Sequence, residues 1–183
     1  MIKPHIKYSS GIILEKLPLP KGNKLTIFCK NIGLNHFLYL YKIKNLDLDT
    51  LNLIFLQIKI QKEYLFINQF KVINYFENIR NSLYKKIISQ TILEIIKKTI
   101  PTNQKENKIF NLTLKFLEYL DKTKNDSLIL HNFSKFLNLY IQNLGYQIPN
   151  QKDITKILTE IEKIANSTLN SKDLINEILS QKI

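Results

Sequence analysis

Residues 24–30 read Lys-Leu-Thr-Ile-Phe-Cys-Lys, and this stretch has the alternation of a β-strand. Leu25, Ile27 and Cys29 fall on one face, whereas the opposite face begins and ends with a lysine. Successive side chains of a strand point to opposite faces of a sheet, so we expect the apolar set to be buried. The stretch therefore predicts a strand with one face in a core, where Cys29 serves as a small apolar residue.

Four further strand-like runs surround it, at residues 8–16, 34–43, 53–60 and 64–73. They are rich in Ile, Leu, Phe and Tyr and are separated by proline, glycine, asparagine and aspartate. A short connection at Gln61-Lys62-Glu63 predicts a hairpin turn. Five strands in about 70 residues are typical of a small Greek-key barrel such as the OB-fold, although a five-stranded sandwich fits the same pattern.

From Phe76 onward the apolar period changes from strand to helix, with steps of three and four residues. Helices are expected over residues 78–99, 105–121, 126–144, 152–165 and 172–181. Their ends carry start and stop signals, namely Pro101, the cap Asp126-Ser127, Gly145 followed by Tyr146, and Pro149. The sequence thus predicts the α+β class, with an N-terminal OB-fold β-barrel over residues 1–75 and an all-α helical domain over residues 76–183.

The chain of 183 residues is strongly basic, with 27 lysine and arginine residues against 15 acidic ones and a formal net charge of +12. The abundance of Lys, Ile and Asn is typical of an AT-rich genome, so codon bias accounts for part of the lysine. Residues 1–75 still hold 11 lysines against 4 acidic residues, a charge of +7 in the smaller part. A basic excess of this size favours polyanionic partners, nucleic acid first among them.

Cys29 is the only cysteine, which excludes a disulfide within the chain and a multi-cysteine zinc site. No run of about 18 apolar residues is present, so we expect no membrane span. Residues 1–5 lack the apolar core of a secretory signal. These features predict a cytoplasmic protein without membrane contact.

Residues suited to catalysis are scarce. His5, His36 and His131 lie far apart, and none has a metal-binding spacing. Acidic pairs are few, and phosphate-binding glycine motifs are absent. We therefore expect no catalytic residue, no metal and no cofactor, with His36 on the surface of the sheet. A nuclease or transferase is the least favoured interpretation.

Lysines gather at the ends of the first three strands and in their connections. In a barrel these ends would form the rim of a groove, where lysine neutralises phosphate without reading base sequence. Most aromatic residues of these strands must build the core, and Tyr39 and Tyr41 are the preferred platforms for base stacking. The predicted DNA-binding residues are Lys16, Lys21, Lys24, Lys30, Lys42, Lys44, Tyr39 and Tyr41.

Two lysine pairs, Lys85-Lys86 and Lys97-Lys98, lie on the first long helix and are expected mainly as a solvated face. Further along the chain, Lys135 stands beside Phe136 and Tyr140. An ammonium group next to an apolar notch could bind an acidic tail that ends in a hydrophobic residue. These three are the candidate protein-binding residues.

Several short motifs occur in a recognisable order. Residues 10–14 (SGIIL) are followed by residues 25–28 (LTIF) and 31–33 (NIG), then by residues 46–51 (LDLDTL), and residues 136–149 end in LGYQIP. Together they resemble the bacterial recombination mediator RecO, a family that begins with an S/E-G-I-V-L strand and has a helix ending in L-L-G-Y-x-P.

That resemblance implies an N-terminal OB-fold, a helical domain and a non-enzymatic role in recombinational DNA repair in the bacterial cytosol, at the nucleoid. The family binds single- and double-stranded DNA, anneals complementary strands coated with single-strand-binding protein and helps to load the recombinase. Its partners are RecR and the acidic C-terminal tail of the single-strand-binding protein. The resemblance puts the six lysines named above on the DNA-facing surface. Many members carry a four-cysteine zinc module after L-G-Y-x-P, whereas residues 147–151 contain no cysteine, so the resemblance is to a short member without zinc.

An OB-fold RNA-binding or ribosome-associated module is the main alternative, because OB barrels also bind RNA. Comparing single-stranded DNA with structured RNA at equal length and salt would separate the two interpretations. The enzyme interpretation would instead require cleavage of labelled DNA in the presence of Mg²⁺ or Mn²⁺.

Overall fold

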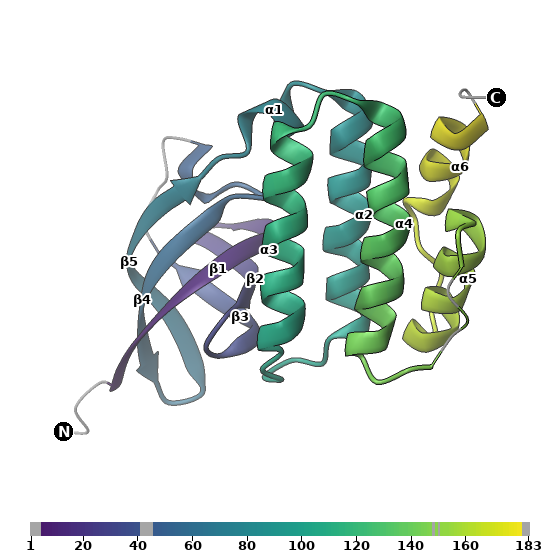
Figure 1. The fold of residues 1–183 in the computed structure, drawn as a ribbon. Coiled ribbons are helices and arrows are strands. Elements are labelled where there is room, and N and C mark those ends of the chain that lie inside the picture. Colours follow the sequence, from purple (N-terminus) through teal and green to yellow (C-terminus); the bar gives the residue numbers. More distant parts are fainter. Residues whose placement is uncertain (1–4, 41–45, 148, 150, 181–183) are drawn as a thin grey trace. The chain divides into compact units, whose positions relative to one another are not determined.

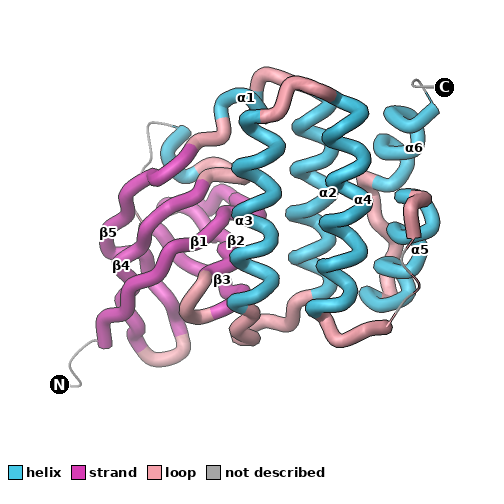
Figure 2. The backbone as a smooth tube through the Cα atoms, viewed as in Figure 1, coloured by secondary structure: helices cyan, strands magenta, loops and turns pink. Residues whose placement is uncertain are grey.

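The computed structural model describes residues 5–40, 46–147, 149 and 151–180 (Figure 1). It shows an α+β fold in which five strands are followed by helices (Figure 2). The strands are β1 (His5–Leu19), β2 (Gly22–Cys29), β3 (Gly33–Tyr39), β4 (Leu53–Gln61) and β5 (Tyr64–Asn74), with a short 3-10 helix η1 (Leu46–Leu48) before β4. All five predicted strands are present, as is the hairpin turn, which falls at Lys62 and Glu63. The third, predicted over residues 34–43, ends at Tyr39, and residues 41–43 lie outside the described part of the chain.

The helices also follow the predicted ranges, with one interruption. They are α1 (Glu77–Arg80), α2 (Leu83–Thr99), α3 (Asn107–Lys122), α4 (Asp126–Asn143), α5 (Ile154–Ala165) and α6 (Lys172–Ser180). Asn81 and Ser82 separate α1 from α2 where the sequence predicts one continuous helix. The predicted cap at Asp126-Ser127 is wrong by one residue, because the side chain of Asn125 accepts the hydrogen bond from the Leu128 N–H at 3.1 Å.

The end of α4 confirms the prediction for Gly145 and Tyr146. Gly145 has a φ of 92°, and its N–H donates to the carbonyl of Gln142 at 3.0 Å. The N–H of Tyr146 folds back to the carbonyl of Ile141 at 3.2 Å. This pair of bonds is the Schellman arrangement, which satisfies carbonyls that the helix leaves without a partner.

The chain folds into two compact units. The strand unit comprises residues 1–75 and 100–107, and the helical unit comprises residues 76–99 and 108–183. Residues 100–107 join the strands through a bridge between Thr102 and Leu34 and a 2.8 Å hydrogen bond from the Asn103 N–H to the Leu34 carbonyl. The helical period of the sequence gives no sign of this excursion, because backbone groups make the contact.

Neighbouring strands follow the ring order β1-β2-β3-β5-β4, and β1 pairs with both β2 and β4. Of the paired strands that the structure describes, β3 and β5 run parallel and the other pairs run antiparallel. The ring is uneven, because β4 and β5 pair along most of their length, whereas β3 and β5 share two residue pairs, Phe37 with Leu65 and Leu38 with Phe66. A register shift after Ile13 lets β1 turn from one partner strand to the other.

The inner side of this ring holds the apolar core of the strand unit. Leu25, Ile27 and Cys29 all lie in it without exposed surface, as the alternation of β2 predicts. Burial raises the pKa of the Cys29 thiol, so the group stays protonated and packs as a small apolar side chain. Residues that alternate with this core lie on the outer side of the ring, where some, such as Phe28, are buried and others are exposed.

Candidate nucleic-acid interface

Three of the predicted DNA-binding lysines lie together at the β1–β2 hairpin. Lys21 is exposed in the turn, while Lys16 and Lys24 are half-buried on the two strands. Register pairs Lys16 with Leu25 of the core and Lys24 with the exposed Leu17. Lys16 therefore lies on the inner side of the ring, at its mouth, whereas Lys24 lies on the outer face.

Of the remaining predicted lysines, Lys30 lies apart from this group. Lys30 follows the last residue of β2, and its N–H donates to the Ser10 carbonyl at 2.9 Å. Because the eight residues of β2 span about 26 Å, Lys30 and the hairpin lie at opposite ends of the strand. Lys42, Lys44 and Tyr41 fall outside the described residues.

The described aromatic residues of β2 and β3 are buried or half-buried. Phe28 and Phe37 have no exposed surface. Tyr39 is half-buried, and its ring meets that of Phe70 edge-on, with 5.6 Å between centroids and 82° between planes. Phe70 packs against the inner core, so Tyr39 faces inward rather than toward solvent.

A row of side chains crosses the outer face of four strands. Register places Leu38 of β3 beside Lys24 of β2, Phe66 of β5 beside Leu38, and Lys59 of β4 beside Phe66. Strands in a sheet lie about 4.8 Å apart, so the two lysines stand about 14 Å from one another. We call Lys24, Leu38, Phe66 and Lys59 the outer row.

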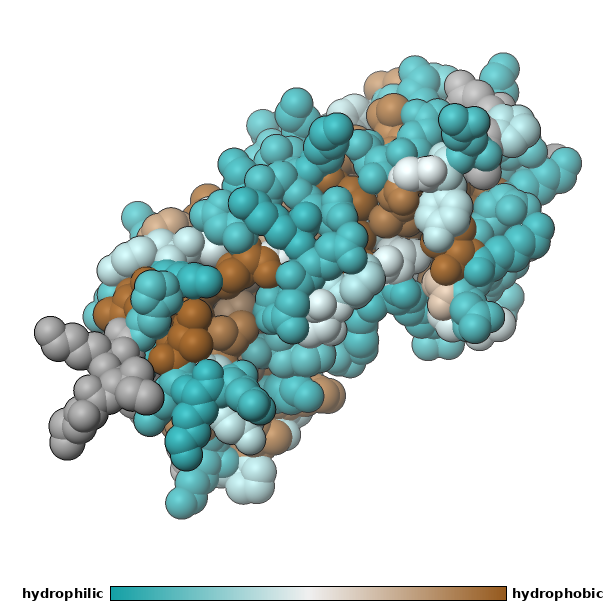
Figure 3. Space-filling model, turned by 90° about the horizontal axis from the view of Figure 1, so that it is seen from below, coloured by the Kyte–Doolittle hydropathy of each residue, from teal (hydrophilic) through white to brown (hydrophobic). Residues whose placement is uncertain are grey.

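Exposed apolar side chains extend the outer row at both ends. Leu17 pairs with Lys24, Ile6 pairs with Lys59, and both apolar residues are about half exposed. Figure 3 shows apolar side chains on the strand unit, at the left, bordered by hydrophilic ones. A cavity of about 250 Å³ opens along the row, lined by Leu38, Leu40, Lys59, Gln61, Phe66, Ile67 and Asn68.

Lys59 and Phe66 were not predicted, although the sequence carries part of the signal. The alternation of β4 and β5 places each of them opposite to the core residues Ile58 and Ile67. The pairing of β3 with β5 aligns Phe66 and Lys59 with Lys24 across the sheet. A local sequence pattern cannot predict this contact, because the two strands are distant in the sequence.

A polar chain lies next to the row, across β1, β2 and β3. The Thr26 hydroxyl donates to Glu15 Oε2 at 3.2 Å and lies 3.1 Å from His36 Nδ1. A hydroxyl has one hydrogen, so Nδ1 of His36 donates to Thr26 while Thr26 donates to Glu15. His36 is exposed on the sheet surface, as predicted, whereas Thr26 is almost fully buried. This arrangement orients the imidazole but leaves the hydroxyl out of reach of a substrate.

The structure corrects the candidate protein-binding notch at Phe136 and Tyr140. Both side chains are buried in the helical unit, with exposed fractions of 2% and 0%. The Phe136 ring packs 4.7 Å from that of Phe116, and the Tyr140 hydroxyl lies 2.5 Å from Thr99 Oγ1. Phe136 and Tyr140 therefore lie on the face of α4 that packs into the core, and they do not form a surface notch.

Lys135 is exposed, and it lines a cavity of about 430 Å³ that α4 forms with α5 and α6. Asp153 is engaged as the N-cap of α5, where it accepts a hydrogen bond from the Lys156 N–H. The cavity lining combines apolar side chains with the cations of Lys135 and Lys152 and with the carboxylate of Asp153. Its lining residues are Leu130, His131, Ser134, Lys135, Asn138, Gln151, Lys152, Asp153, Ile154 and Leu179.

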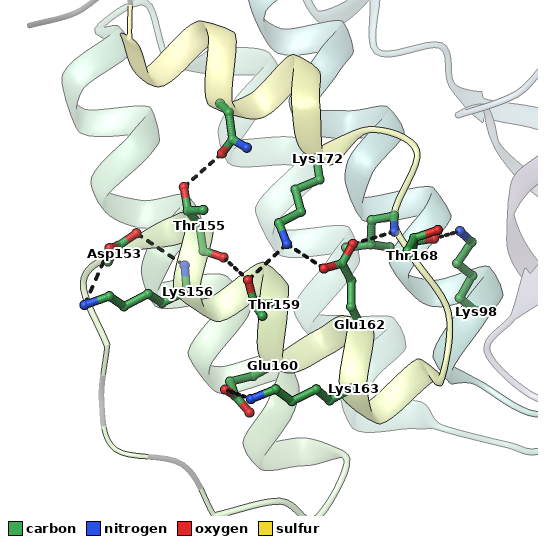
Figure 4. A network of polar contacts seen from close by, with 12 residues as sticks. Lys98, Asp153, Thr155, Lys156, Thr159, Glu160, Glu162, Lys163, Thr168 and Lys172 are labelled. Atoms are coloured by element: carbon green, nitrogen blue, oxygen red, sulfur yellow. Dashed lines mark hydrogen bonds and ion pairs between the residues drawn. The ribbon is translucent and has the colours of Figure 1, made fainter.

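The basic pairs of α2 are partly structural. Lys85 is 8% exposed, and its Nζ donates to the Asp121 carbonyl near the end of α3 at 3.1 Å. Lys98 forms an ion pair with Glu94 at 2.8 Å. Its ammonium group also donates to the Thr168 carbonyl (Figure 4). The expectation of a solvated face is therefore wrong for Lys85 and Lys98.

Two carboxylates hold the connection between α5 and α6. Glu94 accepts hydrogen bonds from the hydroxyl and the N–H of Ser171 and from the N–H before it. Glu162 accepts from the Leu169 N–H at 2.8 Å and from Lys172 Nζ at 2.5 Å (Figure 4). Partial burial raises the pKa of each carboxyl, but these hydrogen bonds outweigh it, so the pKa values of Glu94 and Glu162 lie below the ordinary value.

Among the residues that the structure describes, no three His, Cys, Asp or Glu side chains are grouped so that they could hold a metal ion. Within the same part of the chain, no helix has the length and apolar character needed to cross a bilayer. Comparison of the sequence with models of protein families finds no match, and comparison with curated proteins finds none either. The geometry of the two units therefore carries the functional argument.

Proposed function

We propose that this chain is a non-enzymatic nucleic-acid-binding protein with an OB-fold, acting as a mediator in recombinational DNA repair as in the RecO family that its motifs resemble. The outer row carries the proposal, because it sets two lysines on either side of an aliphatic and an aromatic side chain across four strands. The protein would bind single-stranded DNA, anneal complementary strands and help to load the recombinase onto strands coated with single-strand-binding protein.

The strand order supports an OB-fold. This fold is a five-stranded Greek-key barrel that is partly open, and the short seam between β3 and β5 agrees with such an opening. OB-folds bind oligonucleotides on the face of the second and third strands and with the loops that join strands one to two and four to five. In this chain Lys24 and Leu38 belong to that face, and Lys21 and Lys62 lie in those two loops.

The residue types fit a ligand with a charged backbone and flat bases. Lysine binds phosphate as a point charge and does not distinguish bases. Phe66 offers a ring to any base, because every base has a π-face. Annealing needs no bond chemistry, only charge neutralisation that lets two strands approach and contacts weak enough to release bases for pairing.

The helical unit would supply the protein contact. The cavity beside Lys135 is lined by apolar side chains and by two lysines against one carboxylate, which suits an acidic peptide with a hydrophobic end. We assign the acidic tail of the single-strand-binding protein to this cavity, in place of the notch that Phe136 and Tyr140 do not form. RecR enters the proposal through the family resemblance alone.

The direct test is the salt dependence of binding to a single-stranded oligonucleotide. Each phosphate contact contributes about 0.7 to the slope of log K against log salt, so Lys24→Gln with Lys59→Gln should lower the slope by about 1.4. The matched control replaces Lys108 and Lys115, two exposed lysines of α3, in the same way and should leave the slope unchanged.

Three outcomes would contradict the proposal in different ways. Absence of binding at low salt would remove it. An equal loss in the control variant would mean that net charge alone, rather than the outer row, governs binding. Tighter binding of RNA than of DNA of equal length would favour the RNA-binding alternative.

A further inference from the structure

A pair of exposed aromatic rings lies on the outer face of β1 and β4. Tyr8 is 53% exposed and Phe55 is 44% exposed, so solvent reaches both rings. Their rings are stacked, with centroids 6.2 Å apart and planes inclined by 16°. Phe55 lies four residues from Lys59 along β4, so the pair begins about 13 Å from the outer row.

Amide side chains hold the tyrosine in place. Gln57 Nε2 donates to the Tyr8 hydroxyl at 2.9 Å, and Asn68 Nδ2 donates to Gln57 Oε1 at 2.6 Å. These two bonds link β1, β4 and β5 on the solvent side of the sheet. A ring that is already oriented loses little freedom when a flat partner stacks on it.

The charge around the rings favours an anionic partner. β4, β5 and residues 5–14 of β1 contain no aspartate or glutamate. Lys59 and Lys71 lie on the same face as the rings, and register places the exposed Lys71 directly opposite Phe55. A second copy of the chain would bring the same positive face against itself, which like-charge repulsion disfavours.

We infer that Tyr8 and Phe55 form a base-stacking site for single-stranded nucleic acid, continuous with the outer row. The inference rests on the proposed function and adds a preference to it: bases must be unpaired to reach the rings, so single strands bind here and duplexes do not. Lys59 and Lys71 would hold the phosphates on either side of the stacked bases.

The test uses the full chain with Tyr8→Ala and Phe55→Ala combined. Binding of an oligothymidine should weaken by about tenfold or more, since stacking on one ring is worth a factor of this order. Binding of a duplex of equal length should not change. A 2-aminopurine in the single strand should lose the fluorescence change that the wild-type protein produces.

Two controls protect the result against loss of folding. The ring-preserving pair Tyr8→Phe and Phe55→Tyr should retain binding within about twofold, because stacking does not need the hydroxyl. Tyr146→Ala removes another exposed aromatic ring, 47% exposed in the helical unit, and should have no effect. Circular dichroism and thermal unfolding should match the wild type for all three variants.

The inference is overturned if the double alanine variant binds the single strand as tightly as the wild type, or if duplex binding falls equally. It is also overturned if the wild type sediments as a dimer that this variant dissociates, because the face would then join two copies. Failure of the proposed function looks different, since the wild-type protein would then bind neither single strand nor duplex.

Discussion

Glu94 on α2 accepts hydrogen bonds from both the hydroxyl and the N–H of Ser171, at 2.7 and 3.0 Å, although 77 residues separate the two. The Glu94 side chain is 16% exposed, and Lys98 pairs with it at 2.8 Å. This contact fastens the start of α6 to α2. Glu94 therefore stabilises the fold of the helical unit, although the protein as a whole is strongly basic.

Replacing Glu94 by glutamine should destabilise the helical unit. The amide carries no charge for Lys98 and presents one oxygen where the carboxylate presents two, so the free energy of unfolding should fall by about 1–3 kcal/mol. Urea unfolding followed by circular dichroism at pH 7 measures the loss. Glu177→Gln, at an exposed position of α6, is the matched control and should stay within about 0.5 kcal/mol of the wild type.

The same residue predicts a pH dependence. The pKa of Glu94 is lowered in the folded protein, so its contribution is complete above the ordinary carboxyl value of about 4.3 and is lost as the pH falls through the lowered folded value. The difference in unfolding free energy between wild type and Glu94→Gln should therefore shrink below about pH 4. A difference that stays constant from pH 7 to pH 3 would contradict this account.

Gly33 should resist replacement more strongly than Gly145. Both have positive φ, 78° and 92°, which costs an alanine about 1–2 kcal/mol. A Cβ at Gly33 would also lie 1.9 Å from the carbonyl oxygen of Gln104, whereas nothing lies within 4 Å of one at Gly145. Gly33→Ala should thus cost about 3 kcal/mol or more in urea unfolding, and Gly145→Ala clearly less. Equal losses of unfolding free energy would show that the contact between residue 33 and residues 100–107 does not limit the replacement.

The fold was largely predictable because its local signals are consistent. Alternation marks each strand, and three- and four-residue steps mark the helices, so all five strands and the main helices follow from the sequence. The return of residues 100–107 to the strands escaped prediction because backbone contacts, such as that between Asn103 and Leu34, leave no pattern in side chains. The ring order likewise depends on the two residue pairs of β3 with β5.

The candidate site was less predictable, since it depends on the register that aligns residues of neighbouring strands. Lys24 was identified from the sequence, but its neighbours Phe66 and Lys59 come from a hairpin that follows much later in the chain. Phe136 and Tyr140 show the opposite failure. Their spacing suits a surface notch and a core equally well, and only packing decides that they are buried.

Lys85 and Lys86 should differ sharply despite being neighbours. Lys85 Nζ donates to the Asp121 carbonyl near the C-terminus of α3, where a cation is also favoured by the helix dipole, whereas Lys86 is exposed. Lys85→Met keeps the apolar stem and should lower the unfolding free energy by about 1–2 kcal/mol. Lys86→Met should change it by less than about 0.5 kcal/mol. Chemical denaturation of both variants checks this, and equal effects would place Lys85 among the solvated lysines.

The cavity beside Lys135 predicts selective loss of peptide binding. A labelled peptide with several aspartates and a C-terminal phenylalanine should bind the wild-type protein, because the apolar lining takes the ring and the lysines attract the carboxylates. Lys135→Glu reverses one of the two lysine charges and should weaken binding by about tenfold or more in fluorescence anisotropy. Lys115→Glu makes the same change of charge on an exposed part of α3 and should have little effect.

Binding of single-stranded DNA should be unchanged in Lys135→Glu, because the outer row belongs to the strand unit. A parallel loss of peptide and DNA binding would mean that one basic surface serves both ligands, and that the assignment of the acidic tail to this cavity is wrong.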